Sequence, residues 1–173
     1  TPDQREYVET MRSAGEGLRV ILNDILDFSR IEIGRLEIRP APLDIDRLLE
    51  EVRRVMTPSA SDKGLTLTIT RDPSLPRVLI CDPVRLKQIL LNLLSNAIKF
   101  TSSGLVALAV IRTDPQGVPR IGNDPRIWTR FEVKDTGPGI PEQLRQGIFE
   151  PFVQAPDALV HNPGGTGLGL SIS

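Results

Sequence analysis

A wide apolar stripe with helical spacing runs through residues 4–33, and it constrains the fold of this chain more than any other feature. Apolar or small side chains fill two heptad registers and the positions beside them: Met11, Leu18 and Ile25; Tyr7, Ala14, Ile21 and Phe28; Val8, Leu22 and Leu26. This pattern predicts one long helix from Gln4 to Ile33, whose apolar face has to be covered. Two coverings are open: the rest of the same domain, or a helical bundle shared with a second chain.

After Gly34 the pattern changes to short runs separated by proline, glycine and aspartate. Alternating apolar and polar residues predict five strands: Arg35–Leu43, Leu65–Thr70, Arg77–Cys81, Leu105–Thr113 and Ile127–Lys134. Helical spacing predicts two helices: Ile45 to Met56, ending near Pro58, and Val84–Phe100. Asp44 and Asp82 stand where helix N-caps are expected. Residues 114–126 are expected to form a long loop.

The composition excludes several classes of function. Hydrophobic residues make up 39% of the chain and charged residues 25%, and the formal net charge is −1. Because the charges nearly cancel, broad electrostatic binding to nucleic acid or to an anionic membrane surface is not expected. Cys81 and His161 are the only residues of their types, so an intrachain disulfide, a cysteine zinc site and a histidine metal cluster are excluded. We expect a cytoplasmic protein whose chemistry comes from carboxylates, amides, glycines and lysines.

The helix predicted over Val84–Phe100 carries the first candidate site. At 100° per residue, one narrow stripe holds Arg85, Gln88, Asn92, Asn96 and Lys99, while the leucines lie opposite. Amide oxygens are suitable ligands for Mg²⁺, and an ammonium group can meet phosphate oxygens. Taken alone, such a stripe is more often an ordinary solvated polar face.

The second candidate site is the segment Asp135–Ile140, with the sequence DTGPGI, at the end of a predicted strand. A carboxylate held there can accept a hydrogen bond from an exocyclic amine such as that of adenine, and the glycines let the backbone approach a flat ring. A simple turn is the other interpretation, because Asp-x-Gly is common in turns.

The third candidate site is the glycine-rich run Gly164–Leu170, GGTGLGL. Its backbone N–H groups, together with the start of a helix, could hold phosphates. It matches neither the P-loop pattern nor the dinucleotide pattern. A flexible hinge is the alternative.

In this order and spacing, the segments resemble the ATP-binding region of a sensor histidine kinase of the two-component systems. Asn92–Phe100 (NLLSNAIKF) resembles the asparagine box, Asp135–Ile140 the first glycine box, Phe149–Phe152 (FEPF) the phenylalanine box, and Gly164–Ser173 the second glycine box. Residues 4–33 resemble the second helix of the family's dimerisation and phosphotransfer bundle. The resemblance therefore implies an incomplete bundle domain over 1–33 and a C-terminally incomplete catalytic domain over 34–173.

The resemblance also implies the fold and the site residues. The fold class is α+β: the two-layer α/β sandwich of the gyrase, heat-shock chaperone and histidine kinase ATPases, preceded by a long bundle helix. The ATP-binding residues would be Asn92, Asn96, Lys99, Phe100, Asp135, Gly137, Gly139, Ile140, Gly165, Thr166, Gly167, Leu168 and Gly169. Asn96 would ligate Mg²⁺, Asn92 and Lys99 would be catalytic at the phosphates, and Asp135 would bind the adenine amine. Phe149 and Phe152 would anchor a lid over residues 153–163.

The implied activity is transfer of the ATP γ-phosphoryl group to a histidine, for relay to an aspartate on a response-regulator receiver domain. The parent protein would be a homodimer through residues 4–33, without nucleic-acid or membrane contacts by this segment. The acceptor histidine of the family is missing here, and His161 is not a credible substitute, so the fragment is expected to bind ATP without phosphorylating itself.

Two other functions are alternatives. One is a nucleotide-gated conformational module, a degenerate kinase that binds ATP without transfer. The other is ATP hydrolysis, which is disfavoured because Asn92 stands where the hydrolytic relatives need a glutamate.

Overall fold

A computed structural model of the chain describes residues 2–113, 127–151, 153 and 167–172. They belong to two compact units, 38–140 and 1–37 together with 141–173, and each unit is described separately below. Within the described ranges, no helix combines the length and the apolar character that crossing a membrane requires. The loop expected over 114–126 lies outside the described residues.

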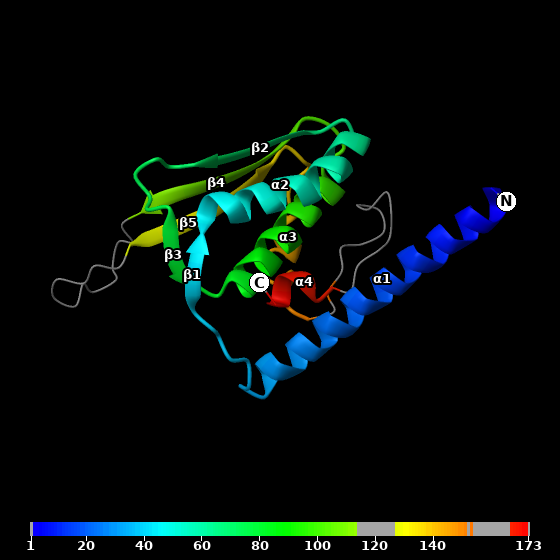
Figure 1. Cartoon of the computed structure of the whole chain (residues 1–173), viewed down its shortest axis with the longest axis horizontal. Coiled ribbons are helices and arrows are strands. Elements are labelled where there is room, and N and C mark those ends of the chain that lie inside the picture. The colour runs from blue at the N-terminus through cyan, green and yellow to red at the C-terminus, as the bar shows by residue number, and fades with distance from the viewer. Residues whose placement is uncertain (1, 114–126, 152, 154–166, 173) are drawn as a thin grey trace. The chain divides into compact units, whose positions relative to one another are not determined.

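The 38–140 unit contains a three-stranded sheet in the order β2–β4–β5 (Figure 1). Strand β4 (Leu105–Thr113) is central, with β2 (Thr66–Arg71) parallel to it and β5 (Trp128–Asp135) antiparallel to it. A separate antiparallel pair joins β1 (Ala41–Asp44) to β3 (Val78–Cys81). The central position of β4 explains its long apolar run, because alternate residues Val106, Leu108 and Val110 are completely buried.

Helices α2 (Ile45–Asp62) and α3 (Pro83–Phe100) cover one face of this sheet (Figure 1). Their apolar faces form one core with β4, to which the two helices contribute Ile45, Leu48, Leu49, Val52, Met56, Ala60, Leu90, Leu94, Ala97 and Ile98. Burying such faces is the main favourable contribution to folding, at about 25 cal/mol per Å² of apolar surface. With the sheet as one layer and the two helices as the other, the unit is a two-layer α/β sandwich.

Both predicted N-caps are confirmed. The Asp44 carboxylate accepts a hydrogen bond from the Arg47 backbone N–H at 3.1 Å at the start of α2. At the start of α3, one oxygen of Asp82 accepts from the backbone N–H groups of Val84 and Arg85 at 3.0 and 3.1 Å. Its other oxygen accepts from the Arg39 backbone N–H at 2.9 Å, and these bonds hold the pKa of Asp82 below its ordinary value.

Helix α2 is longer than the sequence predicts. We expected it to end near Pro58, but it continues through Pro58 to Asp62. Proline removes one backbone donor from a helix. The Thr57 hydroxyl donates to the Arg53 carbonyl at 2.8 Å, and Ala60 continues the buried face one turn beyond Met56. Packing of this last turn therefore outweighs the local cost of the proline.

The first predicted strand is also wrong in extent. A strand was expected over Arg35–Leu43, but regular pairing begins only at Ala41. The partner β3 has only four residues and pairs Ala41 with Cys81 through Asp44 with Val78, so among the described residues no strand lies opposite 35–40. The turn predicted near Pro73 and Pro76 is present, but the strands on either side of it belong to different sheets.

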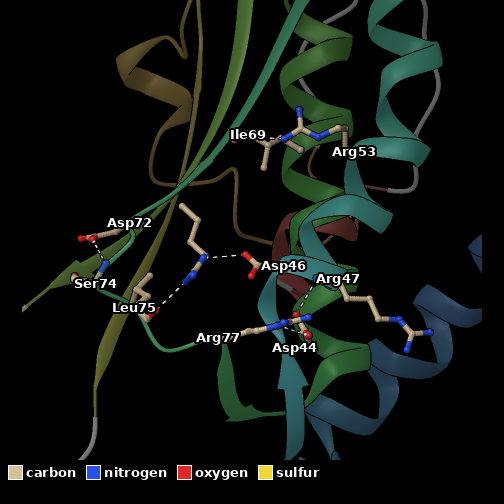
Figure 2. A network of polar contacts seen from close by, with 10 residues as sticks. Asp44, Asp46, Arg47, Arg53, Ile69, Asp72, Ser74, Leu75 and Arg77 are labelled. Atoms are coloured by element: carbon tan, nitrogen blue, oxygen red, sulfur yellow. Dashed lines mark hydrogen bonds and ion pairs between the residues drawn. The ribbon is translucent and has the colours of Figure 1, made fainter.

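Arginine side chains connect the start of α2 to the strands around it (Figure 2). Arg77 Nε donates to Asp44 at 2.9 Å, and Arg71 Nε lies 2.9 Å from Asp46. Arg71 also donates to the Leu75 carbonyl at 2.8 Å. These contacts fix the α2 N-terminus on β2 and β3, because each guanidinium bonds in a set direction.

The other unit contains the long helix predicted at the N-terminus, α1 (Pro2–Glu32), with a short 3₁₀ turn η1 (Glu142–Leu144) and α4 (Gly169–Ile172). Helix α1 contacts α4 within this unit. Seven apolar side chains of α1 remain between 42% and 73% exposed: Tyr7, Val8, Met11, Leu18, Leu22, Ile25 and Leu26. Much of the predicted stripe is thus uncovered.

Candidate functional site

Helix α3 presents the predicted amide stripe at the side of the core. Leu90 and Leu94 are completely buried in the sandwich, whereas Asn92, Asn96 and Lys99 are half-buried. The spacing of four residues places Asn92 and Asn96 on successive turns of one face. Arg85, earlier on this stripe, donates to Gln88 Oε1 at 2.8 Å. The helix therefore holds its two asparagines and its lysine in one line.

The C-terminal end of α3 is fixed by a lysine from the end of α2. Lys63 Nζ donates to the carbonyl oxygens of Ile98 and Lys99 at 2.9 and 2.7 Å. A cation at this end of a helix also interacts favourably with the helix dipole. Beside it, the Lys99 ammonium lies 5.4 Å from the centre of the Phe100 ring. Two residues predicted to contact nucleotide are thus adjacent on a restrained helix end.

The segment after β5 packs against this same helix end. Gly137 donates its backbone N–H to Asp135 Oδ1 at 2.8 Å, which closes a tight turn. A Cβ atom placed on Gly137 would lie 2.8 Å from Asp135 Oδ1, 3.0 Å from the Phe100 carbonyl oxygen and 3.2 Å from Thr101 Oγ1. The fold therefore brings the asparagine-bearing helix and the aspartate–glycine segment into direct contact, and a side chain on Gly137 would force the Asp135 carboxylate to move.

Gly139 and Ile140 complete this segment and are open on one side. Gly139 has φ +74°, a conformation that favours glycine, and a Cβ there would meet nothing within 4 Å. Ile140 is 46% exposed. An exposed apolar side chain beside an open glycine can line a pocket for a flat ring.

The residue that follows Asp135 has a role that sequence reasoning missed. The Thr136 hydroxyl donates to the Ser103 carbonyl at 3.1 Å and accepts from the Leu105 N–H at 3.0 Å. Gly104, with φ +108°, leaves the space that this hydroxyl fills. The turn is therefore tied to the loop after α3. A threonine directly after a strand-ending aspartate was the available sign of such a tie.

The second glycine segment is described only from Gly167 onward. Gly167 has φ +71°, Leu168 is 1% exposed, and Gly169 begins α4. Phe149 is 61% exposed. The predictions for Phe152, His161, Gly165 and Thr166, and for nearly all of the expected lid, concern residues outside the described ranges.

The donor set of the described residues favours amide ligands for any metal ion. In the described ranges, no group of three or more histidine, cysteine, aspartate or glutamate side chains is arranged to hold a metal. The side-chain oxygens of the half-buried residues Asn92 and Asn96 are hard donors that fit Mg²⁺ when phosphate oxygens complete its coordination. Burial and the neighbouring Asp82 raise the pKa of the Cys81 thiol, which argues against a nucleophilic thiolate.

Comparisons with known proteins identify the family. The family described as "Histidine kinase-, DNA gyrase B-, and HSP90-like ATPase" matches residues 81–173. Hybrid signal transduction histidine kinase A of Dictyostelium discoideum is 40% identical over 171 residues, which are 99% of this chain and 8% of that protein. The histidine-protein kinase BarA of Escherichia coli is 38% identical over 173 residues, all of this chain and 18% of that protein. The chain thus spans less than a fifth of either relative.

Solved structures give the same result. Full-length ShkA in complex with AMPPNP is 39% identical, with a TM-score of 0.75 over 99% of this chain and 33% of that chain. The nucleotide-free catalytic domain of the histidine kinase ThkA is 27% identical, with a TM-score of 0.56 over 78% of both chains. The predicted two-layer fold class is confirmed. Sequence, fold and family model agree that this chain belongs to the histidine kinase-, DNA gyrase B- and HSP90-like ATPase family.

Proposed function

We propose that this chain binds ATP with Mg²⁺ and presents the γ-phosphoryl group to a histidine side chain. The observation that carries the proposal is the junction at Gly137, where Asp135 Oδ1 and the Phe100 carbonyl crowd the position that a Cβ would take. Because Gly137 has no side chain, the turn packs directly on the end of α3 and holds Asp135 beside Phe100, the two residues proposed to contact the base. The Asp135 carboxylate accepts a hydrogen bond from the exocyclic amine of adenine, while Phe100, Gly139 and Ile140 line the pocket for the base.

The phosphates are proposed to lie along the polar stripe of α3. Asn96 is the Mg²⁺ ligand, and Asn92 and Lys99 are the catalytic residues that contact phosphate oxygens. Magnesium held there would neutralise charge that develops on the phosphates. By family resemblance, backbone N–H groups of the second glycine segment are further triphosphate ligands: Gly165, Thr166, Gly167, Leu168 and Gly169.

The proposed reaction is phosphoryl transfer. The unprotonated nitrogen of a neutral imidazole attacks the γ-phosphorus and forms a P–N bond, while the bond from the γ-phosphorus to the bridging oxygen breaks and ADP leaves. The other imidazole nitrogen then gives its proton to water. Such transfer depends chiefly on positioning and charge neutralisation. Lys99 and the asparagines supply both, because their helix is fixed at each end. The phosphohistidine then passes its phosphoryl group to an aspartate on a response-regulator receiver domain.

The acceptor histidine is proposed to lie outside this chain, in a cytoplasmic homodimer joined through residues 4–33. The exposed apolar stripe of α1 supports this assembly, since seven large side chains there are available to a second helix. A Leu22→Glu substitution would place a charge within that stripe. We expect it to convert the dimer to monomer in analytical ultracentrifugation, and an unchanged dimer would exclude the α1 interface.

The test of nucleotide binding is Asp135→Asn, titrated with AMP-PNP and Mg²⁺ in a calorimeter. Loss of a hydrogen bond to a charged group should cost about 1–3 kcal/mol of binding free energy, or roughly 5- to 150-fold in affinity. Glu132→Gln is the matched control, because Glu132 lies on the same strand and its carboxylate pairs with Lys134 at 3.1 Å. Equal affinities for the two variants would remove Asp135 from the site.

Phosphoryl transfer needs a separate test in the full-length kinase that carries this segment. Asn96→Ala should abolish Mg²⁺-dependent labelling by γ-labelled ATP, because the metal loses its protein ligand. Ser95→Ala is the neighbouring control: its hydroxyl donates only to the Asn92 carbonyl within α3, at 3.0 Å. Labelling retained in Asn96→Ala would refute the metal assignment, whatever the outcome for Asp135.

A further inference from the structure

Thr101, the residue that caps the C-terminus of α3, has a buried hydroxyl without a hydrogen-bond partner in the described part of the chain. The residue is completely buried, and its backbone N–H donates to the Ala97 carbonyl at 3.1 Å. Leaving a buried hydroxyl unpaired is unfavourable, and buried polar groups in folded proteins are nearly always paired. The unpaired hydroxyl of Thr101 therefore lowers the stability of the folded unit.

The hydroxyl lies next to the Asp135 carboxylate. Thr101 Oγ1 and Asp135 Oδ1 lie 3.2 and 2.8 Å from the same point, the position of a Cβ on Gly137. Because Gly137 has no side chain, no Cβ separates the two oxygens at that point. Rotation of either side chain about one bond is enough to change their separation.

A bound base changes what the Asp135 carboxylate requires. The residue is exposed in this structure, so water can satisfy the oxygens that the Gly137 N–H does not. A base stacked over the turn removes that water, and a carboxylate that loses water needs new donors. The Thr101 hydroxyl is an unused donor adjacent to it.

We infer that Thr101 is a positioning residue for Asp135: its hydroxyl donates a hydrogen bond to the Asp135 carboxylate when a nucleotide base covers that carboxylate. The inference rests on the proposed nucleotide site. Thr101 itself does not touch the nucleotide. It holds the carboxylate in the orientation that accepts the exocyclic amine, and the binding of the base provides the hydroxyl with its missing partner.

The experiment is a double-mutant cycle on the purified protein, with the affinity for AMP-PNP and Mg²⁺ measured by calorimetry. Thr101→Val keeps the shape and removes the hydroxyl, and we expect it to weaken binding about tenfold, or about 1.4 kcal/mol. Thr101→Ser keeps the hydroxyl and should bind within about twofold of the unmodified protein. In an Asp135→Asn background, Thr101→Val should cause little further loss, because the two residues act through one contact.

The stability of the nucleotide-free protein distinguishes a positioning role from a structural one, because loss of a structural hydrogen bond would lower it. In the absence of nucleotide, Thr101→Val should unfold at the same urea concentration as the unmodified protein or a higher one, since the lost hydroxyl had no partner. Thr129 on β5 is the matched control, because its hydroxyl is likewise buried without a partner among the described residues. Thr129→Val should leave nucleotide affinity unchanged.

Three results would overturn the inference: additive losses in the cycle, a Thr101→Ser variant as weak as Thr101→Val, or equal weakening by Thr129→Val. Failure of the proposed function looks different, because the unmodified protein would then not bind AMP-PNP at all.

Discussion

Gly137→Ala is the substitution that tests the junction of α3 with the turn after β5 most directly. The added Cβ would lie 2.8 Å from Asp135 Oδ1 and 3.0 Å from the backbone carbonyl oxygen of Phe100. The carbonyl belongs to the end of α3, which Lys63 restrains, so the Asp135 side chain has to move. That movement breaks the 2.8 Å hydrogen bond from the Gly137 N–H to Asp135.

The expected cost has two parts. Overpacking of this kind costs about 1–3 kcal/mol, while replacing glycine by alanine returns about 0.4–1 kcal/mol through the unfolded chain. A net loss of about 1–2 kcal/mol in the free energy of unfolding follows, measurable as a lower urea midpoint at unchanged slope. Because Asp135 is displaced, the affinity for AMP-PNP should fall about tenfold in the same samples.

The control for this substitution is Gly147→Ala, where the added Cβ meets only the Leu144 carbonyl oxygen, at 3.9 Å. It should leave the affinity for AMP-PNP unchanged. Its urea midpoint should change only by the small gain that replacing glycine by alanine gives through the unfolded chain. If Gly137→Ala binds AMP-PNP as tightly as Gly147→Ala does, the close packing of the aspartate–glycine turn does not shape the site.

Other substitutions test the packing and the charges that support the site. Leu90→Ala, in a completely buried position, should lower the free energy of unfolding by about 2–5 kcal/mol in urea titrations; a loss below that of an exposed leucine would contradict the assigned core. Lys63→Met should lower the free energy of unfolding by about 1 kcal/mol and lower the melting temperature, because two carbonyl oxygens at the end of α3 lose the ammonium group that bonds to them. The pKa of Asp82 is lowered in the folded protein, so its stabilisation is present above the ordinary value of 3.8 and is lost as pH falls through the folded value. Asp82→Asn should therefore be less stable at neutral pH and should lose less stability on acidification below about pH 4; parallel curves for the two proteins would exclude this linkage.

The elements that the sequence predicts well are those in which local preference and burial agree. Strand β4 matches its predicted bounds, because its alternation continues along the centre of the sheet. Helix α3 begins within one residue of its predicted start, at a capping aspartate followed by proline. The errors lie where tertiary packing opposes a local rule. Pro58 remains within α2, and β1 is limited by the length of its partner strand.

The candidate site divides in the same way. Asp135 and Gly137 could be proposed from a strand followed by a glycine-rich turn, since that pattern is local. Contact of this turn with Phe100 depends on the pairing of β5 with β4, which no short pattern specifies. No sequence pattern predicted a role for Thr101, because a single hydroxyl residue after a helix is common and its burial and neighbours are known only from the structure.

The anchoring of α3 at both ends also bears on how this helix moves. Asp82 joins its first turn to the preceding chain at Arg39, and Lys63 holds its last carbonyls. Helix termini usually fray first, so their amide protons exchange with solvent long before those of the middle turns. Here that gradient should be shallow, with both end turns of α3 exchanging nearly as slowly as its centre. Asn92 and Asn96 would then belong to a rigid helix, and any displacement of their backbone would require the whole helix to shift.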